Sequence, residues 1–428
     1  MLRKRVLTLT ALAIAAFWLA MMALLVRREL LLPYFAAGHG GLVIPAEPTD
    51  VWLGLLLNDA AHTPIGYINI RNEAATRDAE TGVQMQFLGR MRLDLGSFKG
   101  ELAMNGDAWA TPKDGLRAFS FSMRSGEHST RIAATIEQGR VRGAIDTGGE
   151  KTPIDLAVGD AAMLTSAPGL GAFTMPSLEV GDEVFVESFD PLTMSSGKAR
   201  VRCIAEESIE SMGRAVPAKV VVTDLSGIKT KAWVDSRGNV MRAETPIGFV
   251  LERMDAADAL KLPGGDGTPA MGLLEFAAIN PLGRTPFRGA TRAELVITGL
   301  EGIANVPTDD AQTPGEDGKL AIAPQGPAED PAPLSDVDRA AALANDAFLQ
   351  IDHPKIADKA REIVGAETDD WKKATLIYDW VHRSIKKNIV PSLPTSLDVL
   401  NTMEGDCNEH TVLFTALARA AGVPARMA

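Results

Sequence analysis

The hydrophobic pattern changes its period along this 428-residue chain, and that change limits the fold more than any other feature. From Val51 to about Leu260, short runs alternate apolar and polar residues, as in VQMQF (83–87) and FSFSM (119–123). Such alternation is typical of strands with one buried and one solvated face, which predicts a curved or partly closed antiparallel sheet. From Ser335 onward, apolar residues recur at helical spacing. The pattern predicts an α+β chain with a β-rich domain at 51–260 and a helical core at 335–428.

Two local patterns add detail to the β-rich domain. AWVDSRGNVMRAE (232–244) predicts a turn at 236–239 between two short strands. The run TPIGY (63–67) returns as TPIGF (245–249), which either marks equivalent strands at the two ends of the domain or is a chance similarity.

Residues 261–334 separate the two parts of the chain. They contain a Gly/Pro/Asp-rich break at 261–268 and a predicted strand, AELVITGL, at 293–300. The stretch 307–333 is rich in Pro, Gly and Asp around a short apolar island at 320–323. This composition indicates a linker or a pair of short strands.

Capping residues predict where the helices of the C-terminal core begin and end. The first helix is expected over DVDRAAALANDAF (336–348), and the third is expected to have Trp371, Leu376, Trp380 and Ile385 among its apolar positions. His382 on that third helix is expected to face solvent. The residues placed to start or end helices are Ser335, Pro354, Gly365, Asp369 or Asp370, and Thr395 or Ser396.

Residues 6–26 form an uncharged, mainly apolar run of about the ~20 residues that span a bilayer as a helix. Basic residues flank it at positions 3–5 and 27–28. A signal peptide would also fit, but the length of the run and the two arginines that follow favour an uncleaved anchor over residues 1–28. A juxtamembrane connector would follow at 29–50. By the positive-inside rule we expect a single-pass protein of the cell membrane, with its bulk outside the cytoplasm.

The composition limits the kinds of partner, metal and cofactor that the protein is expected to bind. The net charge of −12 argues against a nucleic-acid partner, which calls for basic patches. The two cysteines, Cys203 and Cys407, are expected to remain free, with Cys203 a small buried apolar residue beside Val201. Neither cysteine has other potential metal ligands at the spacing typical of a metal site, so we expect no metal and no cofactor.

The candidate catalytic residue lies in the stretch MEGDCNEHTVLFTALARAAGVPARMA (403–428). Asp406 is a good N-cap and Glu409 completes a capping-box pattern, so a helix should begin at Cys407 and end at Gly422. A thiol in that first turn lies where unpaired N–H groups and the positive end of the helix dipole favour the reactive thiolate. The other interpretation is a structural cysteine at a helix start.

The run GDCNEHTVLFTALARAAGVPAR resembles the nucleophile helix of the bacterial transglutaminase-like superfamily, a branch of the papain-like cysteine enzymes. The similarity is dense over 400–426 and extends weakly back to about Ser335. It implies that Cys407 is the nucleophile of a Cys–His–Asp triad whose other members come from two later strands. No residue of this chain matches them, so the resemblance implies a core cut short at Ala428. Such a fragment is expected to be inactive alone, with loosely packed helices.

This resemblance implies a membrane-anchored, periplasmic cysteine protease, amidase or acyltransferase. It would act on the amide or peptide bonds of a protein or peptide substrate through a thioester on Cys407. The alternative is a non-catalytic envelope protein with a binding or structural role, which the unmatched triad partners favour. His410 lies on the same first turn as Cys407 and can hardly align its ring with the sulfur, so we expect it to be structural. The oligomeric state stays open.

Overall fold

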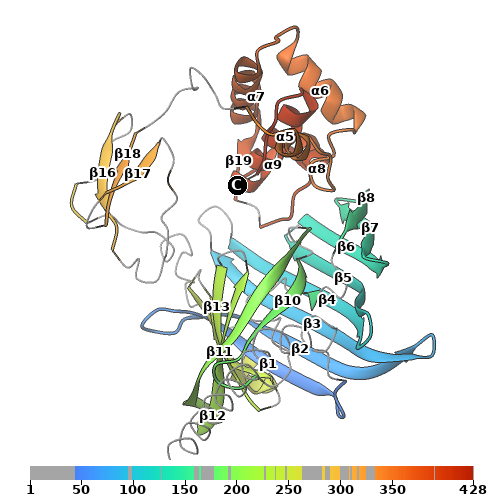
Figure 1. Cartoon of the computed structure of the whole chain (residues 1–428), viewed down its shortest axis with the longest axis vertical. Helices are drawn as coiled ribbons and strands as arrows, with labels where there is room; N and C mark the ends of the chain where they lie inside the picture. Colours follow the sequence, from blue (N-terminus) through green and yellow to red (C-terminus); the bar gives the residue numbers. More distant parts are fainter. Residues whose placement is uncertain are drawn as a thin grey trace, which may run out of the picture.

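The computed structural model of the chain describes residues 44–94, 99–126, 128–158, 163–164, 178–190, 194–225, 228–236, 238–245, 248–262, 282–284, 290–298, 308, 311–315, 318–323, 333–389 and 391–427. They form a large β-sheet, a small three-stranded sheet and a group of C-terminal helices (Figure 1). The predicted membrane anchor at 6–26 lies outside these residues. Among those described, no helix has both the length and the apolar character needed to cross a bilayer.

The largest sheet among the described residues has fifteen strands. The strands are β1 (Thr49–Leu57), β2 (Pro64–Arg77), β3 (Glu80–Asp94), β4 (Lys99–Thr111), β5 (Gly115–Ser125), β6 (His128–Glu137), β7 (Arg140–Thr147), β8 (Glu150–Ala157), β9 (Met163–Leu164), β10 (Glu183–Asp190), β11 (Ser195–Ser211), β12 (Arg214–Leu225), β13 (Ile228–Val234), β14 (Val240–Glu244) and β15 (Phe249–Met254). The runs VQMQF and FSFSM lie in β3 and β5, and the predicted turn at 236–239 lies between β13 and β14, so these predictions are confirmed.

The sheet has two arms that meet at β1. Strand order runs from β8 down to β1 and then from β15 down to β9, so the last strand pairs with the first. Neighbouring strands are antiparallel except β9 and β10. Thr63 and Gly248, one from each TPIG run, bond to one end of β1: the Leu57 N–H donates to the Thr63 carbonyl at 2.9 Å, and the Asn58 N–H to the Gly248 carbonyl at 2.8 Å. Segments at the two ends of the domain in sequence are therefore neighbours in space.

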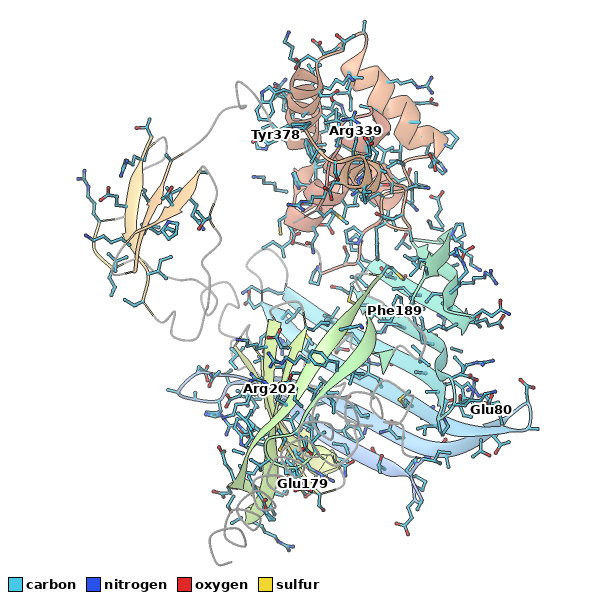
Figure 2. All side chains as sticks on the ribbon, in the orientation of Figure 1. Glu80, Glu179, Phe189, Arg202, Arg339 and Tyr378 are labelled. Atoms are coloured by element: carbon cyan, nitrogen blue, oxygen red, sulfur yellow. The ribbon has the colours of Figure 1, made fainter. Side chains whose placement is uncertain are left out.

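The sheet curls so that its arms face each other (Figure 1). Phe119 on β5 and Phe189 on β10 belong to opposite arms, yet their ring centroids lie 5.6 Å apart. Phe189 is fully buried within the curl (Figure 2). Alternate residues of both arms fill this interior, including Leu53, Val201 and Ile145, because one face of each strand is apolar. The predicted curvature and the predicted burial of Cys203 are confirmed.

Short elements follow the sheet. They are α3 (Ala256–Ala259) and the three-stranded sheet of β16 (Ala293–Val296), β17 (Gln312–Pro314) and β18 (Lys319–Ile322), in the order β16-β18-β17. The strand predicted within 293–300 is present, and the apolar island at 320–323 overlaps β18.

The C-terminal helices are α5 (Asp336–Ala342), α6 (Pro354–Val364), α7 (Asp370–Ser384), α8 (Ser396–Thr402) and α9 (Cys407–Ala420), with the two-residue strands β19 (Lys386–Lys387) and β20 (Glu404–Gly405). The predicted caps are present: Ser335, Asp369 and Thr395 accept backbone N–H groups of the first turns of α5, α7 and α8. The prediction for the first helix is wrong at its end. Asp346 takes the N–H groups of Phe348 and Leu349, and such local bonds compete with a helix.

Helix α9 is the centre of the helical part. Its Leu413 and Leu417 are fully buried and pack with Ile356 of α6, Ile377 of α7 and Val399 of α8. The expectation of loosely packed helices is therefore wrong for the described residues, since four helices bury a common apolar cluster.

The predicted apolar face of α7 is only partly right. Trp371 and Leu376 are 58% and 41% exposed, whereas Ile377 and Val381 are buried in the cluster. Apolar residues occupy several faces of α7, so their helical spacing alone did not identify the buried face. The rings of Tyr378 and His382 stack, and both residues are exposed, as expected for His382.

Candidate active site

Cys407 is the first residue of α9, and reciprocal hydrogen bonds fix the turn before it. The Asp406 carboxylate accepts the Asn408 N–H at 3.1 Å, and the Glu409 carboxylate accepts the Asp406 N–H at 2.8 Å. This is the predicted capping box, so the predicted helix start is confirmed. At the other end, the N–H groups of Gly422 and Val423 bond back to Arg419 and Ala418, a Schellman motif with Gly422 at φ +82°.

Glycine is required before the cap because the Glu409 side chain folds back over it. A Cβ atom at Gly405 would lie 2.2 Å from Cγ of Glu409 and 2.3 Å from its Cβ. Any other residue would therefore displace Glu409 from the Asp406 N–H. Each residue of the Gly-Asp-Cys sequence thus has its own reason. Gly405 leaves room for the Glu409 side chain, Asp406 caps the helix, and Cys407 places a thiol at the first helical position.

The thiol of Cys407 is free, and the residue is exposed at the surface. Partial burial of the sulfur raises the pKa of Cys407, and the charge of the adjacent Asp406 carboxylate raises it further. The N–H groups of Asn408 and Cys407 oppose these effects but do not outweigh them. The expected bias toward thiolate is thus wrong for this arrangement, because burial of the sulfur and then the negative charge of the cap both favour the protonated thiol.

Glu409 is 3% exposed and is fixed through both carboxylate oxygens. One accepts the Asp406 N–H, and the other accepts the Ser392 hydroxyl at 2.6 Å. Burial raises the pKa of Glu409, whereas these two hydrogen bonds lower it.

His410 supports the turn from inside. Its Nδ1 lies 2.6 Å from the Asp406 carbonyl oxygen, and its Nε2 is buried with no hydrogen-bond partner among the described residues. Because its Nδ1 contacts a backbone carbonyl oxygen of the turn, the His410 ring stabilises the turn. This contact supports the structural role expected from the sequence.

A short parallel pairing fixes the turn from the side of α7. Strands β19 and β20 pair, and the Lys386 N–H donates to the Met403 carbonyl at 2.9 Å. The Asn388 N–H donates to the Gly405 carbonyl at 3.1 Å, and the Asn388 side chain donates to Glu404 at 2.7 Å. The backbone that leads into Cys407 is therefore bonded to the chain that leaves α7.

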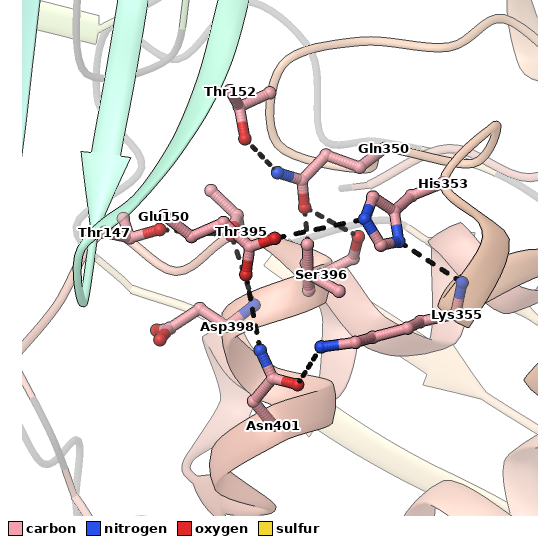
Figure 3. A network of polar contacts seen from close by, with 11 residues as sticks. Thr147, Glu150, Thr152, Gln350, His353, Lys355, Thr395, Ser396, Asp398 and Asn401 are labelled. Carbon is pink, nitrogen blue, oxygen red and sulfur yellow. Dashed lines mark hydrogen bonds and ion pairs between the residues drawn. The ribbon is translucent and has the colours of Figure 1, made fainter.

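The helical part is joined to the end of the β-sheet by a polar network (Figure 3). Gln350 donates to Thr152 of β8 and accepts the Leu397 N–H at 3.0 Å. The hydroxyls of Thr147 and Thr395 lie 3.3 Å apart. Figure 3 also shows Glu150 near His353 and Asn401, with contacts of 3.9 and 3.5 Å.

An apolar contact accompanies these polar ones. Phe348, two residues before Gln350, is 8% exposed and packs inside the cluster of Phe119, Ile132 and Phe189. This interface could not be predicted from the sequence, because its polar and apolar residues form no local motif and lie far apart in the chain.

No candidate metal site accompanies Cys407 in the described ranges. No group of three His, Cys, Asp or Glu side chains gathers there in an arrangement that could hold a metal ion. Cys203 is also free; it is buried in the sheet interior, and that burial raises the pKa of its thiol.

Comparisons with known proteins bear on the two parts separately. The sequence model of the Transglutaminase-like superfamily matches residues 357–428. A β-barrel-like protein of the domain of unknown function DUF1849 from Brucella abortus is 11% identical at a TM-score of 0.35, over 50% of this chain and 98% of that chain. A DUF1089-family protein from Pseudomonas aeruginosa is 16% identical at a TM-score of 0.25, over 41% of this chain and 89% of that chain. No curated protein matches.

Proposed function

Residues 357–428 of this chain are a transglutaminase-like superfamily core, and from this premise we propose that the protein is a cysteine enzyme acting on amide or peptide bonds. The observation that carries the proposal is the position of Cys407. It combines an exposed thiol with the first turn of a capped helix, within the matched segment. Substrates reach an exposed thiol there, and the helix N-terminus favours the negative charge that develops during attack.

In the proposed reaction the Cys407 thiolate attacks the carbonyl carbon of an amide. A C–S bond forms, the C–N bond breaks, and the leaving amine takes up a proton, which gives a thioester on Cys407. Water or a second amine then attacks the thioester and releases the thiol. Hydrolysis gives protease or amidase activity, and attack by an amine gives acyl transfer. The raised pKa of Cys407 means that a base must remove the thiol proton before attack.

The experiment is to incubate the product of the whole reading frame that encodes this chain with a mixture of peptides and a labelled primary amine. Mass spectrometry then follows cleavage, deamidation and amine incorporation together. The proposal expects at least one of these products, and expects it to disappear in Cys407→Ala but persist in Cys203→Ala. No product from that folded wild-type protein would favour the alternative below.

The alternative is a non-catalytic protein with a binding or structural role. The raised pKa of Cys407 favours it, since a thiol beside a carboxylate is mostly protonated at neutral pH and therefore a weak nucleophile. In this case Cys407→Ala would leave every biochemical readout unchanged except thiol labelling.

We also propose that residues 6–26 hold the protein in the cell membrane with the remainder outside the cytoplasm, where it meets protein or peptide substrates. The support is the length of the apolar run and the basic residues around it. Membrane fractionation tests the anchor: the chain should resist extraction by carbonate and dissolve in detergent. Release in carbonate, with loss of the N-terminal segment, would indicate a cleaved signal peptide instead.

A further inference from the structure

We propose that the adjacent ends of strands β6 and β7 position the turn before Cys407, acting through residues 391–395 and the hydrogen bond from Ser392 to Glu409. Residues 391–395 are called the bridging loop below. The inference rests on the proposed function in that it treats Cys407 as the reacting group. It assigns Ser392 and Glu409 as positioning residues and gives the β-rich domain a part in the site.

The first link joins the bridging loop to Cys407. The Ser392 hydroxyl donates to Oε1 of Glu409 at 2.6 Å, and Oε2 of the same carboxylate accepts the Asp406 N–H at 2.8 Å. Glu409 is 3% exposed, and its side chain covers Gly405 so closely that no Cβ atom fits there. A displacement of Ser392 would therefore move the carboxylate that closes the turn before Cys407.

The second link joins the bridging loop to the sheet. Thr130 of β6 and Thr147 of β7 are directly opposite each other in the sheet, and both are buried. The Thr130 hydroxyl donates to the Leu393 carbonyl at 3.4 Å, and the Thr147 hydroxyl lies 3.3 Å from that of Thr395. One cross-strand pair thus bonds to the bridging loop at two points.

The bridging loop itself is stiff. Its sequence is Pro-Ser-Leu-Pro-Thr, and the two prolines fix their φ angles. The Leu393 side chain packs against the apolar cluster of the sheet, and Thr395 caps α8 through the Asp398 N–H at 3.3 Å. Because the bridging loop is stiff and is bonded to the sheet, the position of the sheet determines the position of Ser392.

The test measures how the alkylation rate of Cys407 by iodoacetamide depends on pH in the full chain, followed by mass spectrometry. The variants are Ser392→Ala at the near link and Thr147→Val at the far link, with Thr130→Val as a second variant of the far link. Thr111→Val is the matched control in the sheet, since Thr111 is also buried and accepts one hydrogen bond, from Asp114. Ser335→Ala is the matched control for the loss of a serine hydroxyl.

We expect the near-link and far-link variants to shift the pH profile of Cys407 in the same direction. A loosened turn separates the sulfur from Asp406, so the apparent pKa of Cys407 should fall toward the ordinary value. Alkylation at neutral pH should rise about tenfold for each unit by which the pKa of Cys407 falls. The controls should keep the wild-type profile, and Ser392→Thr and Thr147→Ser should restore it because the hydroxyl is retained.

The inference is overturned if Thr147→Val and Thr130→Val keep the wild-type profile, whatever Ser392→Ala does, because the sheet would then have no influence on the turn. It is also overturned if Thr111→Val shifts the profile equally. Neither outcome depends on turnover. A shifted profile in a chain that never acylates Cys407 would support positioning while contradicting the proposed function.

Discussion

The carboxylate of Glu409 accepts the backbone N–H of Asp406 at 2.8 Å, so a buried acidic side chain closes the turn that presents Cys407. The same carboxylate accepts the Ser392 hydroxyl, and Ser392 belongs to a loop bonded to the β-sheet. The turn and the β-sheet are thus bonded to the same loop, residues 391–395.

Replacing Gly405 with alanine should destabilise the protein. The new Cβ atom would lie 2.2 Å from Cγ of Glu409, and relief of such a clash typically costs ~1–3 kcal/mol. Urea unfolding should show this as a lower midpoint. The control is Gly106→Ala, whose Cβ would have 3.6 Å to its nearest neighbour. Equal stability of the two variants would contradict the close packing of Glu409 over the turn.

Replacing Asp406 with asparagine should make Cys407 more reactive toward iodoacetamide at neutral pH. The Asp406 charge raises the pKa of the thiol, and asparagine removes that charge while remaining a good N-cap. The pKa of Cys407 should therefore fall, and each unit of decrease raises the thiolate fraction about tenfold below the pKa. Asp369→Asn, at the cap of α7, should leave the rate unchanged. A slower reaction in Asp406→Asn would show that the carboxylate activates the thiol instead.

Replacing Phe348 with alanine should loosen the helical part from the sheet. The ring is buried among Phe119, Ile132 and Phe189, and truncation of a buried phenylalanine costs about 3–5 kcal/mol. Hydrogen exchange should increase in the bridging loop and in β6–β8 more than elsewhere. Phe185→Ala removes a ring that is 45% exposed and serves as the control. Uniform exchange changes across the whole chain would argue against an interface at Phe348.

Replacing Asp398 with asparagine should stabilise the protein at neutral pH. Burial raises the pKa of Asp398, and Glu150 raises it further while His128 lowers it. A group whose pKa is raised by folding binds its proton more tightly in the folded state. Stability is therefore lost as pH rises from the ordinary value of 3.8 through the folded pKa.

The stabilisation by Asp398→Asn should accordingly be full at neutral pH and vanish below about pH 3.8. Thermal unfolding over this pH range measures it, with the exposed first-turn residue Asp336 as a control in Asp336→Asn. A destabilised Asp398→Asn at neutral pH would mean that the charge is needed at the interface.

Local sequence signals predicted the local structure well. Alternation located β3 and β5, and the caps Ser335, Asp369 and Asp406 located the starts of α5, α7 and α9. These features depend on residues within a few positions of one another. The pairing of β15 with β1 and the contact of Phe119 with Phe189 join distant segments, and no short-range pattern encodes them.

The site was predictable in its backbone but not in its electrostatics. The spacing of Asp406, Cys407 and Glu409 predicted the helix start, yet it did not show that burial and the capping carboxylate together raise the pKa of the thiol. Ser392 and Thr147 carry no motif, and only the folded chain brings them to the turn and the bridging loop.

The most direct test of the central claim is to look for an acyl group on Cys407. The full chain is incubated with an activated peptide ester, digested and mapped by mass spectrometry before and after hydroxylamine, which cleaves thioesters. The account predicts an adduct on Cys407 that hydroxylamine removes, that is absent in Cys407→Ala and that does not form on the buried Cys203. No adduct on Cys407 of the folded chain, or equal adducts on both cysteines, would contradict a nucleophilic role for Cys407.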